Sequence, residues 1–145
     1  MKLKNLLLLL FLVVSTLGFS QFKFNEYSCS NVNALADPIG SGVSATPDWV
    51  ELMNNSGLPQ KLSGWYLSDD RQNLFKWQVP LYNNTNIMVD SFNVQVIYLC
   101  KHNKSISNPT GVNASSTKID LHTNFDLIQS KTQGPWLYLT KVLGA

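Results

Sequence analysis

Two apolar runs separated by turn-forming residues constrain the fold of this chain most strongly. The first run covers residues 49–54 and leads into Asn55-Ser56-Gly57. These residue types favour turns because they tolerate positive φ or bond their own backbone. The second run covers residues 62–67 and stops at Ser68-Asp69-Asp70. The pattern predicts two β-strands joined by a polar turn.

Strand alternation selects the core side chains. Residues two apart on a strand point to the same face, so Val50 and Leu52 face one way, as do Trp65 and Leu67. We expect these four side chains, together with Trp77 from the next apolar run, to form the core. Burying an aliphatic side chain of this kind contributes roughly 1.5–3 kcal/mol.

Further short apolar runs punctuated by Gly, Pro, Asn and Asp predict additional strands at 22–27, 74–80, 87–89, 94–99, 121–127 and 136–140. The run 94–99 is apolar on both faces apart from one glutamine, which indicates an interior strand. We expect surface loops at 28–46 and 101–118. No stretch beyond residue 20 has sustained helical periodicity, so the chain predicts an all-β fold, an antiparallel β-sandwich.

The first twenty residues have the layout of a secretory signal peptide. Lys2 and Lys4 precede an uninterrupted apolar run at 6–14, and small residues follow up to Ser20. A membrane anchor is the alternative, but a spanning helix needs roughly 20 apolar residues. We therefore expect a signal peptide at 1–20, a single domain at 21–145, and a location outside the cell or at its surface.

Charge and cysteine content narrow the function. Without Lys2 and Lys4, the remaining Lys and Arg residues equal the nine Asp and Glu residues in number, so we expect no nucleic-acid partner. Cys29 and Cys100, the only cysteines, could form a disulfide after export or remain buried thiols. They do not form a recognised zinc motif with the two distant histidines, and we expect no metal or other cofactor.

Three segments taken together, 48–57, 62–70 and 76–80, resemble the lamin-tail domain. The similarity continues to residues 24–27 and to the runs 121–125 and 137–140. The resemblance implies an immunoglobulin-like sandwich over nearly all of 21–145. It also implies a non-enzymatic binding or tethering module at the cell surface. The implied partners are cell-envelope polysaccharide or another surface protein.

The chain departs from the lamin-tail pattern at its C-terminal end. Residues 128–135 replace the Ser-Ala-Ser-Gly-Glu-like turn of bacterial members, and the sequence stops at Ala145 before one further strand. We therefore expect a sandwich without its last strand and an open edge beside residues 137–140. An alternative is that the chain is the N-terminal fragment of a larger surface hydrolase.

Acidic side chains do not predict a catalytic pair. Asp48 and Glu51 point to opposite faces of a strand, and the adjacent Asp69 and Asp70 also diverge, whereas acid–base catalysis needs groups that converge. Glu26 could meet Glu51 across two strands, with Asp48, to hold a cation. Solvated carboxylates or local turn bonds are the simpler interpretation, and we expect no enzyme activity.

Histidines and aromatic residues leave other possibilities open. We interpret His102 and His122 as solvent-facing or hydrogen-bonded side chains. The strand phase or loop position of four aromatic residues could expose them, namely Trp49, Trp136, Tyr66 and Tyr82. Exposed rings would favour a carbohydrate-binding module, whereas packing across strands is the ordinary alternative. Four N-x-[ST] sequons begin at Asn54, Asn83, Asn103 and Asn113, as expected by chance in an Asn-rich chain.

Overall fold

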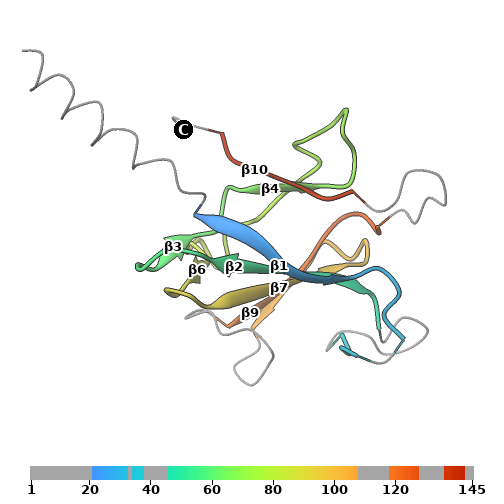
Figure 1. Cartoon of the computed structure of the whole chain (residues 1–145), viewed down its shortest axis with the longest axis horizontal. Helices are drawn as coiled ribbons and strands as arrows, with labels where there is room; N and C mark the ends of the chain where they lie inside the picture. The colour runs from blue at the N-terminus through green and yellow to red at the C-terminus, as the bar shows by residue number, and fades with distance from the viewer. Residues whose placement is uncertain (1–20, 33, 38–45, 108–117, 128–135, 143–145) are drawn as a thin grey trace, which may run out of the picture.

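A computed structural model describes residues 21–32, 34–37, 46–107, 118–127 and 136–142. These residues form an all-β structure with no helix (Figure 1). The strands are β1 (Phe22–Ser28), β2 (Asp48–Asn54), β3 (Gln60–Lys61), β4 (Tyr66–Ser68), β5 (Trp77–Gln78), β6 (Met88–Val89), β7 (Val94–Leu99), β8 (Ser105–Ser107), β9 (Ile119–His122) and β10 (Tyr138–Thr140).

The largest sheet has the strand order β1-β2-β7-β9-β8. Strand β7 lies inside it, between β2 and β9, as its two apolar faces predict. The sheet is not wholly antiparallel, because β7 and β9 are parallel, with Ile97 opposite Leu121 and Tyr98 opposite His122. The reason is that β8 forms within the predicted loop 101–118, and β9 then returns between β7 and β8. The prediction of an uninterrupted loop there is wrong.

Two smaller sheets have the order β10-β4-β5 and β3-β6. The predicted strand at 62–67 is divided because the chain turns after Leu62, where Trp65 N–H donates to Leu62 O at 3.1 Å. Gly64 has a φ of +89° at this turn, and an added Cβ would meet nothing within 4 Å. The glycine is therefore required by its backbone angle and not by a close approach. In the same way, the predicted strand at 74–80 is reduced to β5.

The core lies between the largest sheet and the two small ones. Val50, Leu52, Trp65, Leu67 and Trp77 are all buried in it, together with Phe22, Leu62, Val79, Ile87, Val89, Ile97, Leu99, Ile119, Leu121, Phe125 and Leu127. The Trp65 ring meets the Phe22 ring edge-on at a centroid distance of 5.2 Å, and its Nε1–H donates to Lys61 O at 3.2 Å. Edge-to-face packing of this kind adds about 0.5–1.5 kcal/mol beyond area burial.

The outer face of the largest sheet is also covered where it is formed by β2 and β7. Trp49, Val96 and Tyr98 form a second buried cluster, against which Leu35 and Cys100 pack. Trp49 is only 8% exposed, so the suggestion that its phase could leave it free for a ligand is wrong. Part of the predicted surface loop 28–46 provides the cover, since Leu35 comes from it. Both faces of β2 therefore carry buried apolar side chains, and only one of these faces belongs to the main core.

Asn31 organises the covering segment, by which we mean the described residues 29–32 and 34–37 that follow β1. Its Nδ2 donates to Leu35 O and Pro47 O at 2.5 and 2.9 Å, and its Oδ1 accepts from the backbone N–H of Ala34 and Leu35. A buried amide with four backbone partners fixes a chain that lacks strand pairing of its own. The segment is thus held firmly against the sheet.

Some predictions fall on residues outside the described part of the chain. These are the signal peptide at 1–20 with its cleavage position and the replaced turn at 128–135. Within the described residues, no helix is long and apolar enough to cross a membrane.

Candidate functional site

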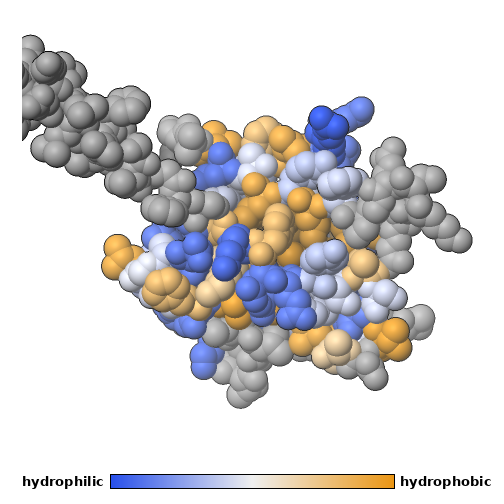
Figure 2. Space-filling view, viewed as in Figure 1, coloured by the Kyte–Doolittle hydropathy of each residue, from blue (hydrophilic) through white to orange (hydrophobic). Residues whose placement is uncertain are grey.

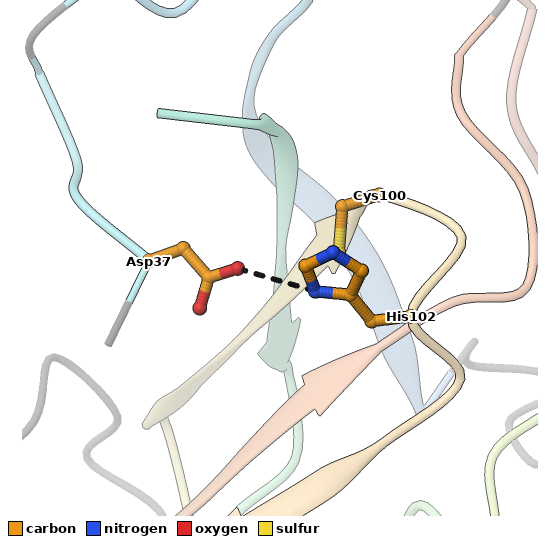
Figure 3. Close-up of side chains that lie close together, drawn as sticks. All are labelled: Asp37, Cys100 and His102. Atoms are coloured by element: carbon orange, nitrogen blue, oxygen red, sulfur yellow. Dashed lines mark ion pairs between the residues drawn. The ribbon is translucent and has the colours of Figure 1, made fainter. Parts of the chain in front are cut away.

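A polar cluster lies on the outer face of the largest sheet, where the covering segment meets the ends of β7 and β9. Asp37 comes from the covering segment, Cys100 and His102 follow β7, and His122 ends β9. Figure 3 shows the carboxylate of Asp37 directed toward the His102 ring, with Cys100 beside it. Alternation along β9 places Leu121 in the core and therefore turns His122 outward, toward this cluster.

Asp37 is the centre of the cluster, and its side chain is fully buried. His122 Nε2–H donates to Asp37 Oδ1 at 2.9 Å. The other carboxylate oxygen, Oδ2, lies 3.8 Å from His102 Nδ1. The carboxylate therefore bridges two histidines that belong to different parts of the sheet.

His122 is held on every side. Its side chain is fully buried, its ring stacks on the Tyr98 ring at 5.0 Å with an interplanar angle of 14°, and its Nδ1 lies 3.2 Å from Lys104 O. Tyr98 in turn donates its hydroxyl to Ala36 O at 3.3 Å. Of the two interpretations offered by the sequence, His122 is hydrogen-bonded and not solvent-facing, while His102 keeps a side chain that is 38% exposed.

Cys100 and His102 are brought together by an unusual backbone. Lys101 and Asn103 have φ values of 58° and 48°, a region that costs ordinary residues about 1–3 kcal/mol and is concentrated at functional sites. Burial, above all, raises the pKa of the Cys100 thiol to about 11, although a backbone hydrogen bond from His102 opposes this change. Burial is also the main cause of the raised pKa of the Tyr98 hydroxyl.

Sequence reasoning missed Asp37 because nothing local marks it. It lies in a segment of small and polar residues directly before Pro38, and its partner His122 is 85 positions away. The sequence feature that could have pointed to this cluster is the pair Cys100 and His102, since a thiol and an imidazole two positions apart can share a face. One donor atom from each of Asp37, Cys100 and His102 lies within 4.8 Å of the other two.

The other acidic side chains do not converge in this way. Glu26 and Glu51 are direct partners in the β1–β2 register, but Glu51 Oε1 accepts from Asn25 Nδ2 at 2.6 Å. They are absent from the one group of potential metal ligands in the described residues. Burial is the main cause of the raised pKa of the Asp48 carboxyl.

Asp69 and Asp70 are engaged locally. Lys76 Nζ lies 2.6 Å from Asp69 Oδ1, and Asp70 Oδ1 accepts from the backbone N–H of Gln72 at 2.8 Å. These are the ion pair and the turn bond expected of structural carboxylates.

A different surface is formed by the sheet β10-β4-β5. Trp136 is 60% exposed beside β10, and the Tyr66 and Phe75 rings meet edge-on at 5.0 Å. Tyr82 is half-buried against the core and is less available than the sequence suggested. In Figure 2, hydrophobic residues reach the surface in the band between β1 and the β4–β10 pair.

Cys29 and Cys100 are both free cysteines, so the disulfide that the sequence left open is not formed. Comparison of the chain with protein-family models, with curated proteins and with solved structures found no match in any of the three.

Proposed function

We propose that this protein is an exported, non-enzymatic binding and tethering module with a lamin-tail-like, immunoglobulin-like sandwich, and that it attaches to another protein at the cell surface. The all-β fold is compatible with this family. The order of the described strands also follows the segments on which the resemblance rests.

The observation that best supports the proposal is the position of β10 at the edge of its sheet. Among the described strands, β10 pairs only with β4, through Tyr138–Ser68, Leu139–Leu67 and Thr140–Tyr66. An edge strand presents backbone N–H and C=O groups that another strand can pair with. Recognition by strand addition uses such an edge for affinity and the side-chain pockets beside it for specificity.

The apolar band beside this edge favours a polypeptide partner. Leu137 and Leu139 pack against the core but remain half-buried, and Figure 2 shows hydrophobic surface between β10 and β1. Strand β1 is the edge of the largest sheet on that side. A partner strand added to β10 would cover the leucines and extend the small sheet at the same time.

Export and attachment are tested in cells that produce the full chain. We expect N-terminal sequencing of the exported protein to begin at Gln21, and fractionation with surface labelling to find it attached to the cell envelope. A Thr140→Lys variant places a charge on the β10 edge, which opposes strand addition. We expect this variant to be released into the medium.

The matched control is Gln78→Lys, which adds the same charge at exposed Gln78 in β5, the opposite edge of the same sheet. It should stay attached like the unchanged protein. Equal attachment of the Thr140→Lys variant would disprove strand addition at β10. Recovery of an uncleaved chain inside the cell would disprove export.

A second candidate function, carbohydrate binding, is favoured by the exposure of Trp136. Flat aromatic faces at a surface can stack on sugar rings, and Tyr66 and Phe75 lie on the same small sheet or its adjoining loop. We expect binding to purified envelope polysaccharide to be lost in Trp136→Ala if this function holds. Phe92→Ala is the matched control, because Phe92 is also 60% exposed but lies between β6 and β7.

A further inference from the structure

Three different metal-ligating groups converge where the covering segment meets the end of β7. Asp37 offers a carboxylate oxygen, Cys100 a sulfur and His102 an imidazole nitrogen, and these atoms all lie within 4.8 Å of one another (Figure 3). We propose that Asp37, Cys100 and His102 bind a single Zn²⁺ ion. This site is separate from the β10 edge and does not depend on the proposed tethering function.

The donor types select the class of metal. Calcium and magnesium take oxygen ligands almost exclusively, so a sulfur and an imidazole nitrogen disfavour both ions. Zinc accepts cysteine sulfur, histidine nitrogen and carboxylate oxygen in one tetrahedral site. Three protein ligands leave the fourth position for water. The 38% exposed side chain of His102 gives the ion a route from solvent.

The observed distances require only a local adjustment. Zinc–ligand distances of roughly 2.0–2.3 Å place the ligand atoms of a tetrahedral site about 3.5 Å apart. His102 Nδ1 and Asp37 Oδ2 are already 3.8 Å apart. Cys100 and His102 are less buried than Asp37, so their side chains can close the remaining distance while the carboxylate stays in place.

Asp37 is oriented by a second histidine that is not itself one of the three ligands. His122 Nε2–H donates to Asp37 Oδ1 at 2.9 Å, and both side chains are fully buried. Hydrogen bonds of this kind orient ligating groups and affect metal affinity strongly. The bond limits rotation of the carboxylate and leaves Oδ2 on the side of His102.

Zinc binding is measured on the purified, reduced protein after removal of metals by a chelator. We expect one equivalent of Zn²⁺ to bind in competition with a chromophoric chelator. Co²⁺ in the same site should show the visible bands of a tetrahedral ion and a sulfur-to-cobalt charge-transfer band. Zinc should also raise the urea midpoint of unfolding, because an ion that binds only the folded state stabilises it.

Variants identify the ligands. Cys100→Ser and His102→Ala should each weaken zinc affinity by more than roughly 100-fold, since even groups beyond the ligands change affinity by about 10–100-fold. Cys29→Ser is the matched control because it removes the other free thiol, and it should bind zinc like the unchanged protein.

Three results would overturn the assignment. The first is the absence of the charge-transfer band with Co²⁺. The second is equal zinc affinity in the unchanged protein, Cys100→Ser and His102→Ala, which would indicate adventitious surface binding. The third is loss of binding in Cys29→Ser. Far-ultraviolet circular dichroism of each metal-free variant separates loss of a ligand from loss of the fold.

Discussion

His122 Nε2 lies 2.9 Å from Asp37 Oδ1, and the two side chains are fully buried although 85 positions separate them in the chain. The bond joins the covering segment to β9. A segment without strand pairing of its own is thereby attached to the central part of the largest sheet.

Removal of either partner should destabilise the protein substantially. We expect His122→Ala and Asp37→Ala each to lower the free energy of unfolding by about 3–5 kcal/mol, because the remaining polar or charged group stays buried. The measurement is urea denaturation followed by far-ultraviolet circular dichroism.

The double variant tests whether the two side chains act together. For residues in contact, the double change should cost less than the two single costs combined by about 0.5–3 kcal/mol. Additive costs would contradict a direct interaction. His102→Ala serves as a control, since its side chain is 38% exposed, and it should cost much less in metal-free protein.

Asn54 connects the end of β2 to two separate turns. Its Nδ2 donates to the backbone O of Leu58, Val89 and Asp90 at 2.8–3.0 Å, and its Oδ1 accepts from Ser56 N–H and Oγ–H. Asn54→Ala should lower the free energy of unfolding by about 2–4 kcal/mol, because several backbone groups lose their partner. Urea denaturation measures the free energy of unfolding of this variant. The control is Asn55→Ala, which makes the same change at the exposed neighbour.

The same bonds make the sequon at Asn54 unusable in the folded protein. Its amide nitrogen is buried and engaged, so a glycosyltransferase cannot reach it after folding. Exposed Asn83 and Asn103 differ in this respect.

Equal stability of Asn54→Ala and Asn55→Ala would show that the buried amide of Asn54 contributes nothing to the free energy of unfolding.

Asp48 should make stability depend on pH. Burial raises the pKa of its carboxyl above the ordinary aspartate value of 3.8, so the folded state binds the proton more tightly than the unfolded state. This contribution to stability is therefore greatest below pH 3.8 and decreases as the pH rises through the folded-state pKa. Asp48→Asn should unfold at a higher urea concentration than the unchanged protein at neutral pH, with the difference disappearing in acid.

Asp70→Asn is the control for the pH experiment. It makes the same chemical change at an exposed turn, where the side-chain oxygen also accepts a backbone N–H. An equal effect of both substitutions would attribute the gain to the amide itself and contradict the role of burial at Asp48.

Cys100 should react slowly while the protein is folded. Burial raises the pKa of its thiol from 9.0 to about 11, which lowers the reactive thiolate fraction at mildly alkaline pH by about 100-fold. In metal-free Cys29→Ser protein, mass spectrometry should show slow alkylation by iodoacetamide in buffer and fast alkylation in urea. Equal rates in the two conditions would contradict burial of this thiol.

The sequence was sufficient for the features set by local chemistry. The alternation in 49–54 identifies Val50 and Leu52 as buried, and the two apolar faces of 94–99 identify an interior strand. These patterns depend only on which side chains leave water. The same reasoning predicts strands around Trp65 and Trp77 that are longer than the observed ones. Apolar content alone does not show where Gly64 turns the chain.

The candidate zinc site was not predictable because it depends on distant parts of the chain. Asp37 reaches His122 only after the covering segment has crossed the sheet, and His102 reaches Asp37 only after β7 has been placed inside it. Periodicity could not show the parallel placement of β9 beside β7 either, since the register depends on where β8 lies. Single-sequence patterns carry no information about such pairings.

The insertion of β9 between β7 and β8 also affects how the protein reaches its native state. Strand β8 precedes β9 in the chain, yet β9 must occupy the space that separates β8 from β7. Pairing between strands that are distant in the chain loses the entropy of loop closure before the new contacts compensate it. Such pairing therefore slows folding. We therefore expect a refolding intermediate in which β2 and β7 are paired while β7 still has a vacant edge, and aggregation during refolding to begin at that edge.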